Sequence, residues 1–222
     1  MPFQNLPLWV QLGAFFLAVN AGMINVLGLM TVLHQAISHM TGNISLLAIH
    51  LLQGNLHSLL YALCIVVSYV LGSMYSGLIL ANSHFRLGRR YGIPLSLVAC
   101  FIVLCWLFLP YWPRYALLWA AVAMGLQNAM VSHYQGAIIR TTHLSGVLTD
   151  LGLALGYFLR GLSAGRRRVI LHLLILFGFL VGGIIATWIY PLLQLNAFLV
   201  PAGLTFILSF IYWVIYWHYR HD

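Results

Sequence analysis

Long apolar runs separated by short polar segments dominate the chain. Six of them approach the roughly 20 residues that a helix needs to cross the hydrocarbon core of a bilayer. These runs cover residues 8–33, 58–81, 93–112, 115–134, 169–190 and 198–217. Runs of this length indicate spanning helices rather than a barrel. The pattern therefore predicts an all-α, polytopic membrane protein with six transmembrane helices.

Two shorter segments, residues 41–52 and 145–159, each follow a polar sequence that occurs twice. The first motif is His39-Met40-Thr41-Gly42-Asn43, and the second motif, 104 residues later, is His143-Leu144-Ser145-Gly146-Val147. A Gly-x-x-Asn pair precedes each motif, namely Gly22 with Asn25 and Gly125 with Asn128. We therefore interpret residues 1–222 as a single membrane domain with an internal repeat, about residues 8–112 and 115–217.

The arginines indicate how the two short segments lie in the membrane. Arg86, Arg89 and Arg90 form one basic loop, and residues 160–168 carry four more arginines. Basic loops favour the cytoplasmic side. An even number of crossings returns the chain to the same side, so both loops can be cytoplasmic if two crossings separate them, whereas three crossings would place them on opposite sides. The segments after the motifs are then re-entrant or broken helices, the two three-span repeats are inverted, and both termini are cytoplasmic. The alternative is eight full crossings in parallel repeats.

Composition excludes most other classes of protein. Hydrophobic residues make up 63% of the chain and charged residues 5%, whereas roughly a quarter of the residues in a soluble domain are charged. The formal charge of +8 comes from arginines in loops, which indicates membrane topology and no nucleic-acid partner. The sequence has no P-loop, no Gly-x-Ser-x-Gly motif and no metal-ligand spacing. We therefore expect no enzyme activity, catalytic residue, cofactor or bound metal.

Polar residues in apolar surroundings form the candidate binding site. Thr41 and Ser145 could cap helix starts, and Gly42 and Gly146 would let a ligand or a helix approach the backbone. A helix that begins at membrane depth directs free N–H groups inward, which favours an anionic or polar group. The candidate solute-binding residues are Asn25, His39, Thr41, Gly42, Asn43, Gln127, Asn128, Arg140, Thr142, His143, Ser145 and Gly146. The alternative is that these residues only form hydrogen bonds between helices.

Asp150 is the one acidic residue before Asp222. A carboxylate within a membrane is costly and is a functional hypothesis by default, so Asp150 and His143 are the candidates for carrying a coupling proton. We expect Arg140 to be the countercharge of Asp150. The alternative is that this ion pair only fastens the second motif to the rest of the protein. The first half has Ala36 and Leu46 at the corresponding positions.

Three motifs occur in order between residues 38 and 151 of the chain. They are Ser38-His-Met-Thr-Gly-Asn43, Met124-Gly-Leu-Gln-Asn128, and Arg140-Thr-Thr-His-Leu-Ser-Gly146 with Leu148-Thr-Asp-Leu151. In these motifs the chain resembles the YoaK family of small bacterial integral membrane proteins. Ser145 stands where that family often has threonine, which keeps the hydroxyl group. The resemblance implies a six-span protein of the bacterial inner membrane whose biochemical activity is largely undefined.

These features support two hypotheses of function. In the first, the protein is a transporter or channel for a small polar or anionic solute, which binds at the midplane where the two motif helices meet. In the second, it is a non-transporting membrane module that binds a lipid or a partner protein. An intramembrane enzyme ranks third. The expected partners are the lipid bilayer and the solute, and small-x-x-x-small patterns leave a homo-oligomer open.

Overall fold

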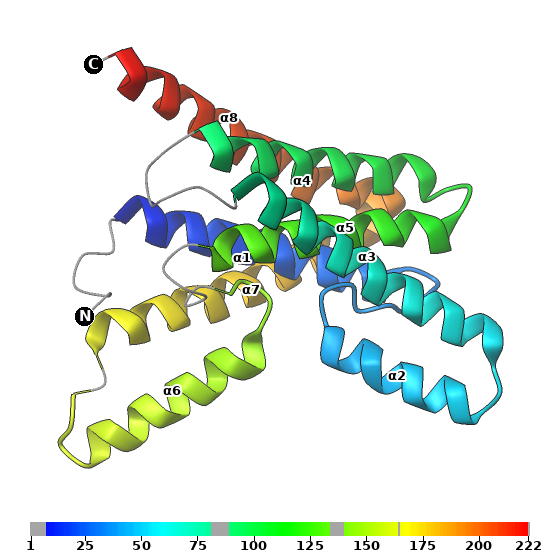
Figure 1. Cartoon of the computed structure of the whole chain (residues 1–222), viewed down its shortest axis with the longest axis horizontal. Helices are drawn as coiled ribbons and strands as arrows, with labels where there is room; N and C mark the ends of the chain where they lie inside the picture. The colour runs from blue at the N-terminus through cyan, green and yellow to red at the C-terminus, as the bar shows by residue number, and fades with distance from the viewer. Residues whose placement is uncertain (1–7, 81–88, 134–139, 164, 222) are drawn as a thin grey trace.

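The computed structural model describes residues 8–80, 89–133, 140–163 and 165–221 of the 222-residue chain. Every regular element in these ranges is a helix (Figure 1). The elements are α1 (Leu8–Met30), α2 (Met40–Leu52), α3 (Leu56–Leu80), α4 (Arg89–Phe108), α5 (Pro113–Ser132), α6 (Leu144–Leu159), α7 (Arg166–Leu193), the 3-10 helix η1 (Gln194–Phe198) and α8 (Leu199–His221). The all-α class predicted from the sequence is confirmed for this part of the chain.

Five helical segments in the described ranges are long and apolar enough to cross a membrane. The last of them, Arg166–His218, contains α7, η1 and nearly all of α8. Pro191 near the end of α7 and a positive φ of 51° at Gln194 interrupt it, because proline lacks an N–H donor and a positive φ lies outside the right-handed helical region. The structure is therefore that of a multi-pass membrane protein.

The helices α2 and α6 are too short to span a bilayer. They have 13 and 16 residues, so they extend roughly 20 and 24 Å, whereas the hydrocarbon core is about 30 Å thick. Figure 1 shows both helices beginning near the centre of the molecule and running outward in opposite directions. Each packs against the long helix that follows it, α2 against α3 and α6 against α7.

Two tightly packed helix pairs, α1 with α7 and α3 with α5, form the centre of the molecule. A Cβ atom placed on Gly22 of α1 would overlap the carbonyl oxygen of Phe179, and one placed on Gly125 of α5 would overlap that of Tyr69. The reciprocal glycines make the same kind of contact, Gly182 with Val19 and Gly72 with Val122. Only a residue without a side chain permits such close approach of two backbones. Each pair joins a helix of the first half to a helix of the second half.

Burial differs strongly between the central and the peripheral helices. The long helices α1 and α5 are the most enclosed, and their buried residues include polar side chains such as Asn20 and Gln127. Large apolar side chains are exposed along α2, α3, α6, α7 and α8. Apolar outer faces of this kind suit contact with lipid, because hydrocarbon tails are as apolar as the side chains themselves.

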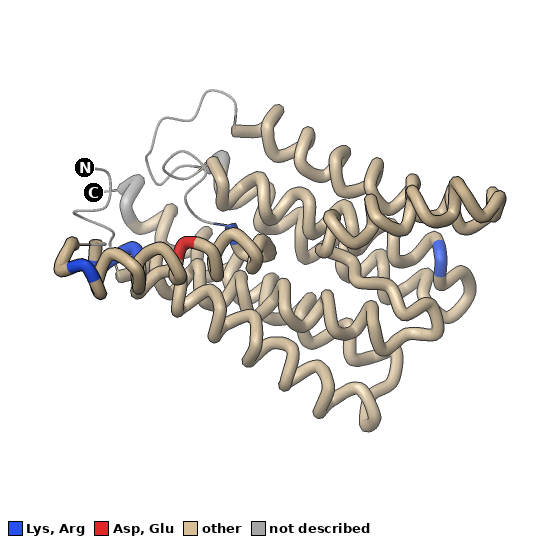
Figure 2. Tube along the Cα trace, turned by 90° about the horizontal axis from the view of Figure 1, so that it is seen from below, with Lys and Arg blue, Asp and Glu red and all other residues tan. Residues whose placement is uncertain are grey.

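Charge is distributed unevenly along the molecule. Figure 2 shows most of the described arginine positions toward the end of the bundle at which α1 begins and α8 ends. At this arginine-rich end α6 finishes, and α7 begins with three consecutive arginines, residues 166–168. Arg114 lies in the first turn of α5, which begins at the opposite end. The bundle therefore has a basic end and a nearly uncharged end.

Candidate functional site

A cavity of about 630 Å³ lies between the starts of α2 and α6. Its walls come from both motifs and from the long helices α1, α3, α5 and α7. The candidate residues that line it are Asn25, His39, Thr41, Asn128, Arg140, Thr142, His143 and Ser145. Two segments about 100 residues apart in the chain thus contribute to one cavity. Gly42, Asn43, Gln127 and Gly146 are not among its lining residues.

Asn25 holds the loop that leads into α2. Its Oδ1 atom accepts hydrogen bonds from both the backbone N–H of Ser38, at 3.1 Å, and the hydroxyl of Ser38, at 3.0 Å. The loop is therefore attached to α1 directly before the first motif. Because Asn25 and Ser38 both line the cavity, this attachment also fixes part of the cavity wall.

Asn43 stabilises the first motif from inside the protein. Its side chain is 2% exposed, accepts a hydrogen bond from Gln35 at 2.5 Å and donates one to the carbonyl oxygen of Ala36 at 3.2 Å. Both partners lie in the loop before α2. A buried amide with partners on both of its atoms avoids the cost of an unsatisfied polar group. The geometry therefore gives Asn43 a loop-bracing contact outside the cavity.

Asn128 performs for the second motif the task that Asn25 performs for the first. Its Oδ1 atom accepts a hydrogen bond from the hydroxyl of Thr141 at 3.0 Å. Its Nδ2 group donates to the hydroxyls of Thr142 and Tyr69, the latter at 2.6 Å. The Asn128 side chain thus connects three elements: α5, α3, and the loop that precedes α6.

Gln127 belongs to a fully buried hydrogen-bond network beside the cavity. The side chain is 0% exposed; it donates to the carbonyl oxygen of Leu17 at 2.9 Å and to Thr141 at 3.2 Å, and it accepts from Asn20 at 2.8 Å. These bonds connect α5 to α1 and to the second motif loop. Gln127 therefore forms hydrogen bonds between helices, as in the alternative interpretation of the candidate residues.

The starts of the two motif helices differ from the sequence interpretation. His39 and His143 occupy the N-cap positions and make no side-chain capping hydrogen bond. The expectation that Thr41 and Ser145 act as caps is wrong, because α2 begins at Met40 and α6 at Leu144, which places both hydroxyl residues inside the first turn. Within the described ranges, no acceptor bonds the backbone N–H groups of Thr41, Gly42, Ser145 and Gly146. Both helices therefore begin with free donors.

The glycines of the motifs make room for the histidine rings. A Cβ atom on Gly42 would overlap the ring of His39, and one on Gly146 would come within 3.0 Å of the ring of His143. The group that approaches each glycine is therefore the histidine three residues earlier, not a neighbouring helix. In both motifs the ring lies over the first turn of the helix, next to its free N–H groups.

Arg140 lies beside the second motif histidine. Its Nη1 atom is 3.1 Å from Nδ1 of His143. A guanidinium group only donates hydrogen bonds, so in this contact Nδ1 accepts and the ring's N–H group is on Nε2. This leaves the Nε2–H group of His143 available as a donor. His39 has no such neighbour, since Ala36 occupies the corresponding position.

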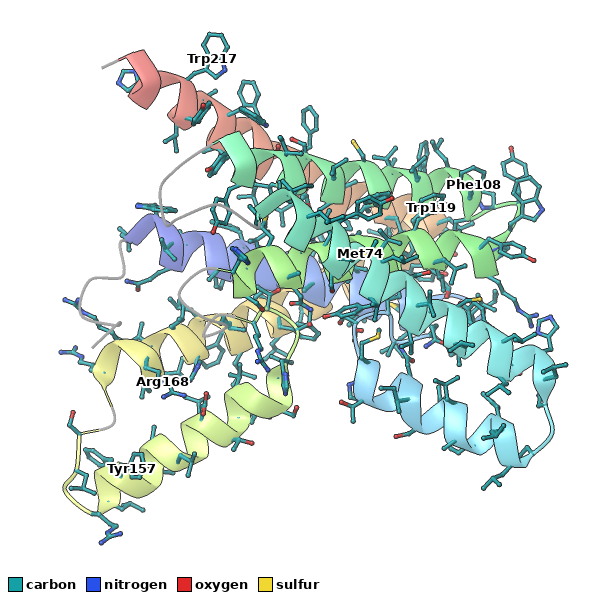
Figure 3. All side chains as sticks on the ribbon, in the orientation of Figure 1. Met74, Phe108, Trp119, Tyr157, Arg168 and Trp217 are labelled. Carbon is teal, nitrogen blue, oxygen red and sulfur yellow. The ribbon has the colours of Figure 1, made fainter. Side chains whose placement is uncertain are left out.

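Asp150 faces α7 rather than the cavity. Its carboxylate forms an ion pair with Arg168 at 2.9 Å, and Nε2 of His172 lies 3.5 Å from the same oxygen. Figure 3 shows Arg168 projecting from α7 toward α6. The expectation that Arg140 is the countercharge of Asp150 is therefore wrong. Arg168 lies 18 residues further along the chain, and the hairpin of α6 and α7 brings it back beside Asp150.

The charge in the cavity is positive. Arg140 is the one arginine among the described lining residues, and no Asp or Glu lines the cavity there. The free N–H groups at two helix starts add the positive end of each helix dipole. This combination favours an anion or a polar group with negative partial charge, and it disfavours a cation.

Several cavity residues were missed by the sequence reasoning. Ser38, Tyr69 and Ser73 line the cavity, and the Ser73 hydroxyl also lies 3.1 Å from the carbonyl oxygen of Gly125. Tyr69 and Ser73 lie in the same helix as Gly72, which packs against α5. No feature of the sequence marks these three residues as cavity residues. In the described part of the chain, no three His, Cys, Asp or Glu side chains are grouped so as to hold a metal ion.

The chain belongs to the family described as "Protein of unknown function (DUF1275)", whose model matches residues 13–211. This match extends from the first half of α1 into α8 and includes both motifs. No curated protein and no solved structure matches the chain. The expectation of an uncharacterised family is confirmed, and the YoaK name itself stays a resemblance.

Proposed function

We propose that this member of an uncharacterised family is a transporter or channel of the bacterial inner membrane for a small polar or anionic solute, which binds in the cavity between α2 and α6. One observation carries the proposal: the two repeated motifs, far apart in sequence, open into the same cavity, which contains Arg140 and no described acidic residue. A site built from two halves of the chain and placed between long helices is typical of membrane transporters.

The proposed topology has six crossings, by α1, α3, α4, α5, α7 and α8. The arginine-rich end is placed in the cytoplasm, because short basic loops favour that side. The start of α1 and the end of α8 are then both cytoplasmic. Helices α2 and α6 enter from opposite faces of the membrane as half-helices, and their non-helical approaches are tolerated at membrane depth because they are packed within protein or line the cavity.

Equivalent contacts in the two halves support the proposal of inverted repeats. Gly22 and Gly125 contact carbonyl groups of α7 and α3 in the same way, and Asn25 and Asn128 each accept a hydroxyl hydrogen bond from the loop before a motif helix. Each half supplies one helix to each central pair. Because each central pair contains one helix from each half, the two halves could rock about the glycine contacts. This movement would expose the cavity to each side of the membrane in turn.

The proposed solute contacts follow from the free donors. Arg140, the Nε2–H of His143 and the first-turn N–H groups of both motif helices would bind a negatively charged or strongly polar group. We assign any coupling proton to His143 rather than to Asp150, because Asp150 is paired with Arg168 outside the cavity. In this proposal Asp150 fastens α6 to α7. This is the structural role inferred from the sequence as the alternative, with Arg168 in place of Arg140 as the partner.

Transport assays with paired arginine variants test the proposal. Purified protein in liposomes is loaded onto a solid-supported membrane, and currents are recorded on jumps of sodium chloride, sodium sulfate and sodium acetate. We expect an anion-dependent current for at least one salt, and a loss of roughly tenfold or more in Arg140→Gln, since hydrogen bonds to charged groups contribute about 1.5–3 kcal/mol. Arg160→Gln removes the same charge outside the cavity and should leave the current unchanged. Equal currents in both variants would exclude the charged site.

The second candidate, a lipid-binding module, has one observation in its favour. An apolar groove of about 370 Å³ lies on the outer side of α1, α5, α4 and α8, and its lining includes Trp9, Phe16 and Leu208. An acyl chain would fit such a surface. This function predicts lipid copurifying with the protein, no anion current, and no effect of Arg140→Gln on lipid binding.

A further inference from the structure

Two aromatic residues occupy corresponding positions in the cavity wall. Tyr69 of α3 and Phe179 of α7 both line the cavity, and the carbonyl group of each makes the close contact with a glycine of the partner helix, Gly125 and Gly22 respectively. The close packing of α3 with α5 and of α1 with α7 depends on backbone atoms at these positions. The two side chains are therefore free to differ without changing how the helices pack, and they differ by one hydroxyl group.

The hydroxyl of Tyr69 is positioned to donate a hydrogen bond to a solute. It accepts a hydrogen bond from Nδ2 of Asn128 at 2.6 Å, and no described residue accepts its own proton. A phenol group both donates and accepts, so its O–H is available within the cavity. Phe179 offers only an apolar ring at the corresponding position of α7.

The lining residues divide into a polar and an apolar set. The polar set includes Ser38, Ser73, Arg140, Thr142 and His143. The apolar set consists of Leu29, Ala36, Met40, Ala129, Leu144 and Phe179. A cavity with this mixture suits a ligand that has both a polar group and a hydrocarbon part, because few polar groups fix its orientation while apolar contact supplies affinity. A fully hydrated inorganic ion would leave the apolar set without contact.

The described lining carries one full positive charge, which favours a solute with a single negative charge. Arg140 is its only arginine, and no Asp or Glu lines the cavity there. A planar guanidinium group matches a carboxylate, with which it can form two parallel hydrogen bonds. A dianion such as sulfate would find no second arginine in the described lining.

We propose that the solute is a small aliphatic monocarboxylate, whose carboxylate group binds Arg140 and the Tyr69 hydroxyl and whose hydrocarbon chain contacts Phe179. The location of the site rests on the proposed function, and the class of substrate goes beyond it. Tyr69 and Phe179 are then the residues that determine specificity, one for the polar head and one for the chain.

Calorimetric titration of the full chain in detergent tests the substrate class without requiring transport. Sodium butyrate should bind roughly tenfold more tightly than sodium acetate, because each buried methylene contributes about 0.8 kcal/mol. Arg140→Gln should weaken butyrate binding by roughly tenfold or more. Sodium sulfate and butylammonium chloride, the controls for charge number and charge sign, should not compete. Equal affinity for acetate and butyrate, or competition by sulfate, would overturn the proposal.

A matched pair of variants separates the two aromatic positions. Tyr69→Phe should weaken the binding of acetate and butyrate alike, by roughly two- to tenfold, since one neutral hydrogen bond is lost. Phe179→Tyr should reduce the preference for butyrate over acetate. Thermal midpoints within experimental error of the wild type would show that both variants fold, and Phe179→Tyr remains informative should Tyr69→Phe be unstable. Unchanged affinities in both variants would contradict the assignment.

The same measurements distinguish a failure of this inference from a failure of the proposed function. Butyrate binding without any uptake of butyrate into liposomes would overturn the transport proposal and retain the binding site. Anion currents with chloride or sulfate, in protein that binds neither acetate nor butyrate, would retain transport and overturn the monocarboxylate assignment.

Discussion

Arg140 and His143 are joined side chain to side chain across one turn at the start of α6, with Nη1 and Nδ1 3.1 Å apart. The contact brings a permanent positive charge to the point where α6 presents free N–H groups. Ala36 occupies the position before the first motif that corresponds to Arg140. The two motif helices therefore begin with similar backbone geometry but with different charge.

Replacing Arg140 by lysine tests whether the guanidinium geometry matters beyond its charge. We expect Arg140→Lys to keep the preference for anions over cations and to lower the anion current by roughly tenfold, because lysine is a point charge without the planar fork of arginine. The current of Arg140→Gln gives the lower limit. A lysine variant as active as the wild type would show that only the net charge is used.

Alanine at the central glycines should destabilise the fold. In Gly22→Ala and Gly125→Ala the new methyl group meets a backbone carbonyl oxygen, which cannot move aside as a side chain could, so we expect a loss of roughly 2 kcal/mol or more of stability. Gly152→Ala is the control, because nothing lies within 4 Å of its position. Thermal unfolding in detergent, followed by tryptophan fluorescence, should show lower midpoints for the first two variants only.

Asp150 and Arg168 should act as a structural pair. Their side chains are 32% and 46% exposed, so the expected coupling free energy is about 1 kcal/mol or less. Asp150→Asn, Arg168→Gln and the double variant form a cycle whose unfolding midpoints measure it. All three variants should keep wild-type anion currents. If Asp150→Asn abolishes the current while Arg168→Gln does not, the carboxylate itself has a role in transport.

The ends of α2 and α6 should lie on opposite sides of the membrane. Gln53 follows α2 and Ser163 follows α6, and both are exposed. In a background with the three native cysteines replaced, we expect Gln53→Cys to react with a membrane-impermeant maleimide added to intact cells, and Ser163→Cys to react only after the cells are opened. Eight crossings in parallel repeats would place both on the same side.

The sequence predicted the long helices and the two short motif helices because apolar runs and their lengths depend on local composition. It failed where the answer depends on how a helix is rotated or paired. Arg140 is closer to Asp150 in the sequence, but the hairpin of α6 and α7 brings Arg168 to the carboxylate. Tyr69 and Ser73 could not be recognised as cavity residues, since the side of α3 that faces α5 is set by the glycine contacts.

The assignment of individual polar residues was limited for the same reason. Asn43 and Gln127 belong to buried hydrogen-bond networks beside the cavity, whereas Asn25 and Asn128 line it. All four are polar residues in apolar surroundings, and residue type alone does not separate them. The pattern suggests Thr41 and Ser145 as helix caps because a shift of two residues in a helix start is not visible in it.

Water accessibility of the two motifs in liposomes tests most directly whether α2 and α6 begin in one solute-accessible cavity. Thr41→Cys and Ser145→Cys line that cavity, and Gly152→Cys, on the open face of α6, is the control that should contact lipid. With a water-soluble, membrane-permeant thiol reagent we expect both cavity cysteines to react much faster than the control. Reaction at neither position, or at a rate no greater than that of Gly152→Cys, would contradict a water-filled site between the motifs.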